Sequence, residues 1–237
     1  VVADGRTLNY TGNEFNVGEH TLSLSGGGTF ANTMSLVLDN AASKLLLSSI
    51  TVDNVSTSVD NSLGVEVEND STITSLSVSN ITPVSIASGK TLEGTIGVTA
   101  GSIKLTDTGT LASTVEMSGG TTLDADNSLT VSGALTQSGD ITIDVADTST
   151  LTYTGSPISL GEFSLMLTGG GNLLSGGLDL NNANSKLLLS SITVDKVSTS
   201  VDNSLGVEVL SDSTVRNLSL SQKLRLSVGS AQTLIIT

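Results

Sequence analysis

The feature that most constrains the fold of this chain is a long internal repeat. The segment SKLLLSSITVDNVSTSVDNSLGVEV at residues 43–67 returns at residues 185–209 with a single change, from Asn54 to Lys196. Apolar patterning and rough volume usually suffice to specify a fold, so identity at exposed Ser, Thr and Asp positions exceeds what folding requires. We interpret the repeat as a recent duplication, and we expect the one changed position to lie outside the core.

The correspondence between the two copies extends beyond this segment. It begins where LNYTG at residues 8–12 matches LTYTG at residues 151–155, and it fades where VSIASGKTL at residues 84–92 lies opposite LSVGSAQTL. The chain therefore holds one unit of about 142 residues and roughly two-thirds of a second unit. We expect residues 1–145 and residues 146–237 to be successive parts of one continuous structure, an excerpt from a longer array.

Within each unit the sequence breaks into short strands separated by turn residues. Apolar and polar side chains alternate in TLSLS, SLVLD, ITVD, SLSVS, SIKLT and DITIDV, and this period of 2 is typical of strands rather than helices. Clusters such as SGGGT, SGGTT, TGGGN and LDADNS supply Gly, Asn and Asp, which accept the positive φ angles of tight turns. The sequence therefore predicts an all-β chain.

The spacing of apolar anchors predicts how these strands are arranged. The anchors recur mostly at intervals of about 18 to 22 residues, at Leu92, Leu111, Leu129, Leu151, and then at Leu187 and Val207. Coils of about 20 residues that stack about 4.8 Å apart form a parallel β-helix, or β-solenoid, and seven such coils make one unit. At about 20 residues per coil, the 237 residues predict about 12 coils, or rungs. A pair of tandem β-sandwiches is the alternative fold.

Composition supports this prediction and excludes several classes of function. Aromatic residues make up 2% of the chain and Trp and Cys are absent, so the core must be aliphatic and there is no disulfide or thiolate metal site. The 23 acidic and 9 basic residues give a net charge of −14, which repels phosphate backbones and anionic lipid headgroups. We expect no nucleic-acid partner and, since no apolar run approaches about 20 residues, no membrane insertion.

The segment SGGTTLDADNSLTVSGALTQSGDITIDVADTSTLTYTG at residues 118–155 combines short Thr-Leu strands, Ser-Gly and Gly-Gly corners, and Asp or Asn at the turns. Because this combination of strands, corners and turn residues runs along most of the chain, the chain resembles the passenger domains of bacterial autotransporters and surface proteins of the filamentous-haemagglutinin type. The resemblance implies a right-handed β-helical rod that is exported and displayed as an adhesin, a matrix component or a carrier of small functional loops. It carries over no catalytic residue.

Acidic residues offer the main candidate chemistry. Five carboxylates are candidates to hold calcium, or to act as acid and base in a β-helical polysaccharide hydrolase or lyase: Asp124, Asp126, Asp140, Asp144 and Asp147. However, no EF-hand loop or glycine-rich calcium nonapeptide is present. In DITIDV the alternation places Thr142 and Asp144 on the solvent face, and Asp147 falls in a turn. We therefore interpret these carboxylates as surface residues.

The only histidine, His20, aligns with Phe163 in the second unit. A position that accepts either side chain predicts surface packing rather than a catalytic or metal-binding role. Without a second histidine, no His-pair metal site can form.

Three other features have structural explanations. The one local basic cluster, Arg216, Lys223 and Arg225, is expected to keep a strand face soluble. The GGG motifs at residues 26–28 and 169–171 lack the Lys-Ser/Thr or helix of a phosphate-binding loop, so they predict corners. Thr-rich segments such as TSTLTYT would form an ice-binding hydroxyl ladder only if stacked in register, and their drifting spacing argues against one flat face.

The sequence thus predicts a structural or adhesive module of an extracellular or cell-surface repetitive protein, which extends, covers or self-assembles into filaments. The expected partner is another copy or a neighbouring repeat, with glycans or a host or neighbouring cell surface as further partners. We predict that the chain is not an enzyme and has no catalytic residue, cofactor or metal. A β-helical polysaccharide hydrolase or lyase, or a glycan- or calcium-binding module, is the alternative.

Overall fold

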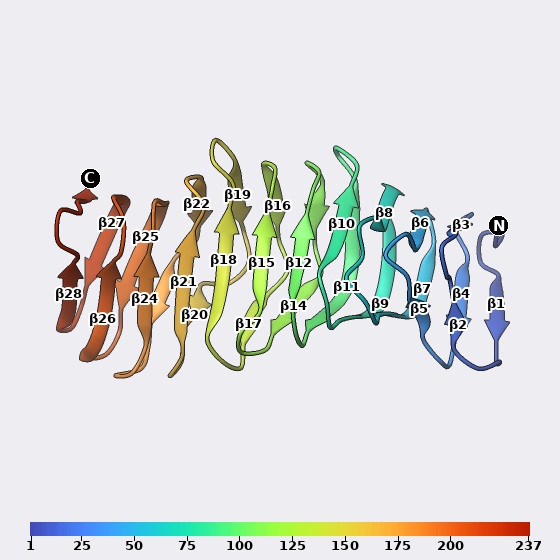
Figure 1. Cartoon of the computed structure of the whole chain (residues 1–237), viewed down its shortest axis with the longest axis horizontal. Helices are drawn as coiled ribbons and strands as arrows, with labels where there is room; N and C mark the ends of the chain where they lie inside the picture. Colours follow the sequence, from blue (N-terminus) through green and yellow to red (C-terminus); the bar gives the residue numbers. More distant parts are fainter.

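The computed structural model describes all 237 residues and contains 29 strands and no helix (Figure 1). Every pairing between strands is parallel. The strands lie in stacked coils along one axis and form a β-solenoid of about 11 turns. The predicted parallel β-helix is therefore confirmed, with about one turn fewer than expected. Tandem β-sandwiches are excluded, because their sheets are antiparallel.

Each coil contributes one strand to an 11-stranded sheet. Its members are β3 (Thr21–Ser25), β6 (Lys44–Ser48), β8 (Gly64–Asn69), β10 (Thr82–Ile86), β12 (Ser102–Leu105), β15 (Thr122–Ala125), β18 (Ile141–Val145), β21 (Ser164–Thr168), β24 (Lys186–Leu189), β26 (Asn203–Val209) and β28 (Leu224–Val228).

The rest of each coil enters an 18-stranded sheet, either as one long strand or as two short ones. The long strands are β7 (Thr51–Thr57), β9 (Ser71–Val78), β11 (Thr91–Val98), β25 (Thr193–Thr199) and β27 (Ser213–Leu220). The short strands are β1 (Thr7–Tyr10), β2 (Phe15–Asn16), β4 (Thr29–Asn32), β5 (Leu36–Leu38), β13 (Thr110–Leu111), β14 (Thr114–Met117), β16 (Leu129–Val131), β17 (Leu135–Gln137), β19 (Thr150–Tyr153), β20 (Ile158–Ser159), β22 (Asn172–Ser175), β23 (Leu178–Leu180) and β29 (Leu234–Ile236).

The core is a set of aliphatic columns that run along the axis of the solenoid. One cluster of 51 buried apolar residues extends from the first coils to the last ones. Successive coils place side chains directly over one another, as in the column formed by Leu45, Val65, Val84, Leu105, Ala125 and Val145. Strand alternation produces these columns, because every second side chain points inward.

The predicted series of anchors was wrong in its register. Leu92 and Leu111 are partners as expected, but Leu111 continues to Val131, and Leu129 lies two residues earlier on the same strand. The last two anchors pair with each other in the other sheet: Leu187 and Val207. Coil length varies between 19 and 24 residues, from Thr91 and its partner Thr110 to Ile141 and its partner Leu165, so spacing alone does not identify the column.

The second unit continues the first without a break in either sheet. β18 pairs with β21, and β19 pairs with β22, so the pairing passes directly across residues 145 and 146. The two units therefore share one core and one axis (Figure 1).

A ladder of two amides explains the one change in the repeated segment. Asn32 is buried and donates from Nδ2 to the backbone oxygen of Asn54 at 2.6 Å, while Asn54 donates from Nδ2 to the backbone oxygen of Asn32 at 2.8 Å. In the second unit Ser175 and Lys196 take these positions; the Ser175 hydroxyl is buried without a partner, and Lys196 is exposed. Asn54 is half-buried, so the changed position lies outside the core, as predicted.

We predict that Asn32→Ser lowers the free energy of unfolding by about 1 to 3 kcal/mol, because it removes the two inter-coil bonds made by the Asn32 side chain, to the backbone oxygen and from the backbone nitrogen of Asn54, and leaves a buried hydroxyl unpaired. The reverse change, Ser175→Asn, should raise the free energy of unfolding. Asn54→Lys, which changes the half-buried partner, serves as the control and should cost less than Asn32→Ser. Urea denaturation measures all three, and equal costs for Asn32→Ser and Asn54→Lys would contradict this account.

Candidate functional site

The five predicted carboxylates do not form one site. Asp124 and Asp144 are register partners on neighbouring strands of the 11-stranded sheet, whereas Asp147 lies in a turn, as predicted. Asp140 accepts a hydrogen bond from the backbone nitrogen of Ser164 at 2.7 Å, which is a structural role. No group of three or more His, Cys, Asp or Glu side chains is arranged to hold a metal ion.

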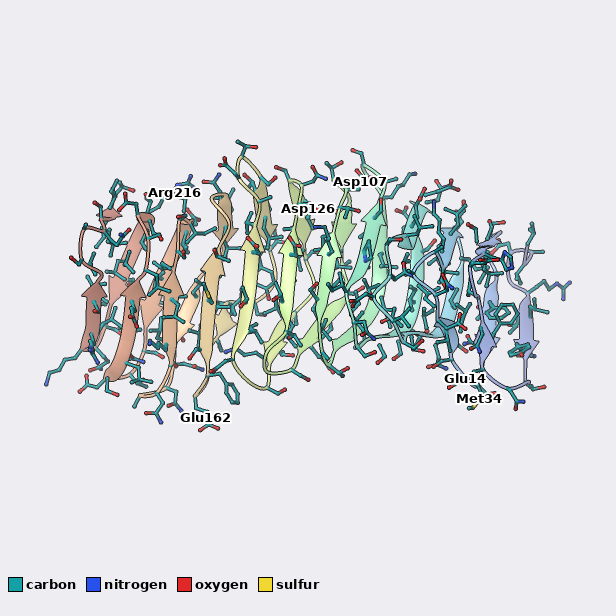
Figure 2. All side chains as sticks on the ribbon, viewed as in Figure 1. Glu14, Met34, Asp107, Asp126, Glu162 and Arg216 are labelled. Carbon is teal, nitrogen blue, oxygen red and sulfur yellow. The ribbon has the colours of Figure 1, made fainter.

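Lys104 forms an ion-paired cluster with two of these carboxylates. Its Nζ lies 3.1 Å from Asp126 Oδ2 and 3.4 Å from Asp124 Oδ2. Asp126 lies at the edge of the rod where the strands turn (Figure 2). The hydrogen bond to Asp126 raises the pKa of Lys104, and burial raises the pKa of the Asp124 carboxyl while the Lys104 charge opposes that rise. Sequence reasoning missed Lys104 because it lies one coil earlier.

The histidine, the GGG motifs and the basic residues considered in the sequence occupy surface or corner positions. His20 is exposed and Phe163 is half-buried, so both are surface positions. The two GGG motifs form corners between β3 and β4 and between β21 and β22. The basic residues do not form one cluster, because Arg216 belongs to the 18-stranded sheet and approaches Asp195 Oδ1 at 4.0 Å. The other two lie at β28 of the 11-stranded sheet: Lys223 and Arg225.

Threonine columns are longer than the drifting spacing suggested. One column stacks Thr7, Thr29, Thr51 and Thr72 in register. A second stacks Thr91, Thr110, Thr130 and Thr152. As expected, other residues interrupt both columns: Glu93 follows the first and Leu174 follows the second.

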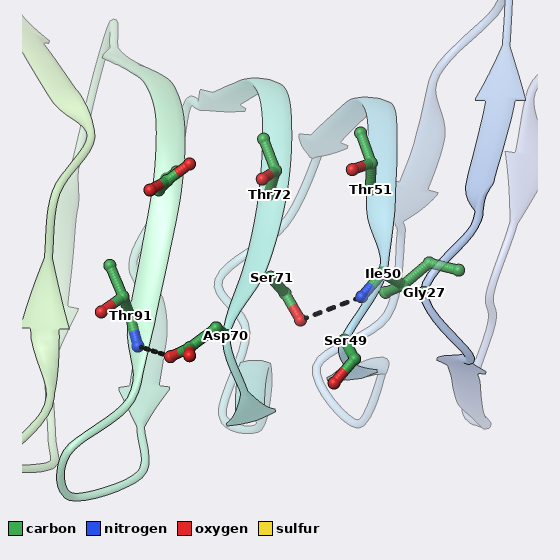
Figure 3. Close-up of a pocket in the computed structure, with 9 residues that line it drawn as sticks. Gly27, Ser49, Ile50, Thr51, Asp70, Ser71, Thr72 and Thr91 are labelled. Carbon is green, nitrogen blue, oxygen red and sulfur yellow. Dashed lines mark hydrogen bonds between the residues drawn. The ribbon is translucent and has the colours of Figure 1, made fainter. Parts of the chain in front are cut away.

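A polar hollow, here called the first groove, lies at the corner where the 11-stranded sheet meets the 18-stranded sheet (Figure 3). It has a volume of about 370 Å³, and its polar side chains include Ser49, Thr51, Asp70, Ser71, Thr72 and Thr91. The corner between β8 and β9 consists of Asp70 alone, whereas the corner between β10 and β11 has four residues, 87–90. The groove thus exists because one coil turns more tightly than its neighbour.

Hydrogen bonds between coils fix the floor of the first groove. Asp70 Oδ1 accepts from the backbone nitrogen of Thr91 at 2.8 Å, which holds the carboxylate in one orientation (Figure 3). Ser71 Oγ accepts from the backbone nitrogen of Ile50 at 3.4 Å and donates to the backbone oxygen of Asn69 at 2.8 Å. The Asp70 carboxylate and the Ser71 hydroxyl are therefore ordered by the fold.

The second unit repeats the same arrangement, here called the second groove, with a volume of about 440 Å³. Asp212 Oδ1 accepts from the nitrogen of Thr233 at 2.7 Å, and Ser213 Oγ accepts from the nitrogen of Ile192 at 3.4 Å. Thr193 and Thr214 occupy the places of Thr51 and Thr72. One lining residue differs, because Ile235 stands where the first groove has Glu93.

A serine with a left-handed backbone lies at the rim of each groove. Ser49 has a φ of 57° and Ser191 a φ of 56°, a region in which side chains other than Gly, Asn and Asp are uncommon. Such conformations persist only where the surrounding structure imposes them. Here the backbone oxygen of Ser49 accepts a hydrogen bond from the nitrogen of Gly27 in the preceding coil.

Sequence reasoning missed the grooves, although one signal was present. The triplet Asp-Ser-Thr at residues 70–72 recurs at residues 212–214, outside the nearly identical segment, while its flanking residues change. The structure gives this triplet a common location, which the linear sequence does not.

Comparisons of the chain with protein-family models, with curated proteins and with solved structures find no match. No helix in the structure is long and apolar enough to cross a membrane.

We predict that Lys104→Met raises the pKa of Asp124 further, because burial already disfavours its charged form and the amine is the main opposing influence. A folded-state pKa above the unfolded value means that Asp124 favours folding at low pH and loses that contribution as pH rises through the folded pKa. Carboxyl-carbon NMR titration measures the shift. The control is Lys44→Met, at a residue four strands from Asp124 in the same sheet. An unchanged Asp124 pKa in Lys104→Met would contradict the prediction.

Proposed function

We propose that this chain is a rod-forming module of an extracellular or cell-surface repetitive protein, which acts by extending, by covering, or by joining to further coils. The observation that carries this proposal is the unbroken pairing of β18 with β21 and of β19 with β22, by which one unit continues into the next. Stability in such a fold is approximately the sum of each coil and its contacts with its neighbours. Length can therefore increase by copying units without redesigning the core.

The last coil presents an edge to which another coil can be added. In β28, Leu226 and Val228 are the register partners of Val207 and Val209, which are buried, yet they are 45% and 42% exposed. The equivalent strand of the first unit is β10, where β12 covers the edge and the matching residues are buried: Val84 and Ile86. An open edge with apolar inward positions is a template for strand pairing.

The first coil presents the opposite edge. β3 pairs only with β6, and Leu8 in β1 is 52% exposed. In the second unit the equivalent strand, β21, pairs on both sides, with β18 and β24. A coil from the same protein or from a second copy would complete both edges, so self-association is the favoured partner interaction.

The surface chemistry supports display and contact rather than catalysis. A net charge of −14 opposes binding to nucleic acid and to anionic membranes. The carboxylates Asp124 and Asp126 are both ion-paired to Lys104, and neither groove nor the hollow beside Met117 includes them. A non-enzymatic extracellular role, with glycans or cell surfaces as further partners, accounts for these features.

We predict that the purified chain forms filaments that lengthen with concentration, whereas each monomer is a rod about 50 Å long. The double variant Leu226→Lys/Val228→Lys places charges on the open edge and should yield single rods. Leu63→Lys, at a residue 46% exposed in the corner between β7 and β8, is the matched control and should assemble like the original chain.

Sedimentation velocity and negative-stain electron microscopy measure this assembly. Discrete rods at every concentration would contradict self-association. Filaments that form equally well with the double variant would show that this edge does not mediate assembly.

A further inference from the structure

We propose that the first and second grooves are two binding sites for one chain of a neutral polysaccharide. This inference deepens the proposed surface role but does not require self-association, because the first groove lies on β7, β9 and β11, far from the edge strand β28; the second groove includes Thr233 and Ile235 of the last coil. The argument rests on three observations: free hydroxyls in register, an oriented carboxylate, and the repetition of both along one corner.

The hydroxyls face the solvent in a row. Thr51 and Thr72 are register partners on adjacent strands, about 4.8 Å apart, and both are half-buried at the groove. Neither hydroxyl has a hydrogen-bond partner within the protein, so each has a donor and acceptor capacity left for a ligand. Figure 3 shows both side chains on the same face of their strands. A sugar ring presents hydroxyls that both donate and accept, and it complements such a row.

A carboxylate held in one orientation gives each groove a directional hydrogen-bond acceptor. Asp70 Oδ1 accepts a hydrogen bond from the backbone nitrogen of Thr91, which leaves Oδ2 as an oriented acceptor for a ligand hydroxyl. Hydrogen bonds to a charged acceptor are roughly twice as strong as those between neutral groups. Asp212 is held in the same way in the second groove.

Charge restricts the class of ligand. The first groove contains Asp70 and Glu93, the second contains Asp212, and neither contains a basic residue. With a net charge of −14 on the chain, uronates, sialic acids, sulfates and phosphates are repelled. The favoured ligand is therefore rich in hydroxyls and uncharged.

The repetition determines how strongly such a ligand binds. Neither groove has an aromatic side chain on which a sugar ring could stack, so each groove alone binds weakly. Seven strand steps separate β7 from β25, which places the grooves about 34 Å apart on the same corner of the rod. A polymer longer than this distance engages both sites, and linkage of two weak sites raises apparent affinity by about 100-fold or more.

The test uses the full chain and immobilised neutral polymers, namely dextran, mannan and galactan, with polygalacturonate as the acidic comparison. Thr51→Val/Thr72→Val removes the hydroxyls of the first groove, and Thr193→Val/Thr214→Val removes those of the second. Valine preserves the shape and strand preference of threonine. The matched control is Thr110→Val/Thr130→Val, a register pair in the same sheet that lies in neither groove. Circular dichroism and melting temperature verify that each variant is folded.

We expect retention on at least one neutral polymer and none on polygalacturonate. Each single-groove variant should lose about 100-fold or more in apparent affinity, the combined variant should not bind, and the control should match the original chain. An oligosaccharide too short to span both grooves should bind weakly and should be insensitive to loss of the second groove.

Failure to bind any neutral polymer, or an equal loss in the control, would overturn the proposal. Retention that requires calcium and survives the valine substitutions would also overturn it, in favour of a cation at Asp70. Leu226→Lys/Val228→Lys changes the last coil but no residue of the first groove, so it should retain polysaccharide binding at the first groove, and failure of self-association and failure of the groove proposal are distinguishable.

Discussion

Backbone hydrogen bonding between successive coils is the interaction on which the rest of this structure depends. It satisfies the polar groups of the strands, and it continues through the corners, where Thr51 bonds to Gly28 and Thr72 bonds to Ile50. Because each bond fixes one coil directly above the last at about 4.8 Å, side chains from distant parts of the sequence become near neighbours. Columns are therefore the basic unit of both core and surface, and a side chain's environment is set mainly by the coil before it and the coil after it.

This constraint explains both the composition and the tolerance of duplication. A narrow coil leaves room inside mainly for aliphatic side chains, and three of the five aromatic residues lie in the first coils, where Tyr10 meets Phe15 with centroids 5.6 Å apart. Since each coil contacts only its neighbours, a copied unit needs compatibility only at the junction. The changes that did occur follow the columns: Ser175 and Lys196 differ from Asn32 and Asn54 at stacked positions.

The sequence contained enough information for the fold but not for the register or the grooves. Alternation, turn residues and the repeat predict a parallel β-helix, because those features are local or copied. Register depends on coil length, which varies, and for this reason Leu129 was placed in the wrong column. The grooves depend on the relative lengths of adjacent corners and on pairs such as Thr51 and Thr72, which are 21 residues apart. No local pattern encodes a contact of that kind.

Comparison of the two units separates what folding requires from what it does not. In the diverged segment after residue 67, Asp70 and Ser71 recur as Asp212 and Ser213, and their hydrogen bonds to the next and the preceding coil account for this. Thr72 also recurs, as Thr214, although its hydroxyl bonds to nothing in the protein. Strand preference does not explain it, since Thr74 on the same strand face becomes Arg216, and even the buried Ile73 becomes Val215. Retention alone does not single out Thr72, because the exposed Ser77 also recurs, as Ser219; what distinguishes Thr72 is its position in the first groove.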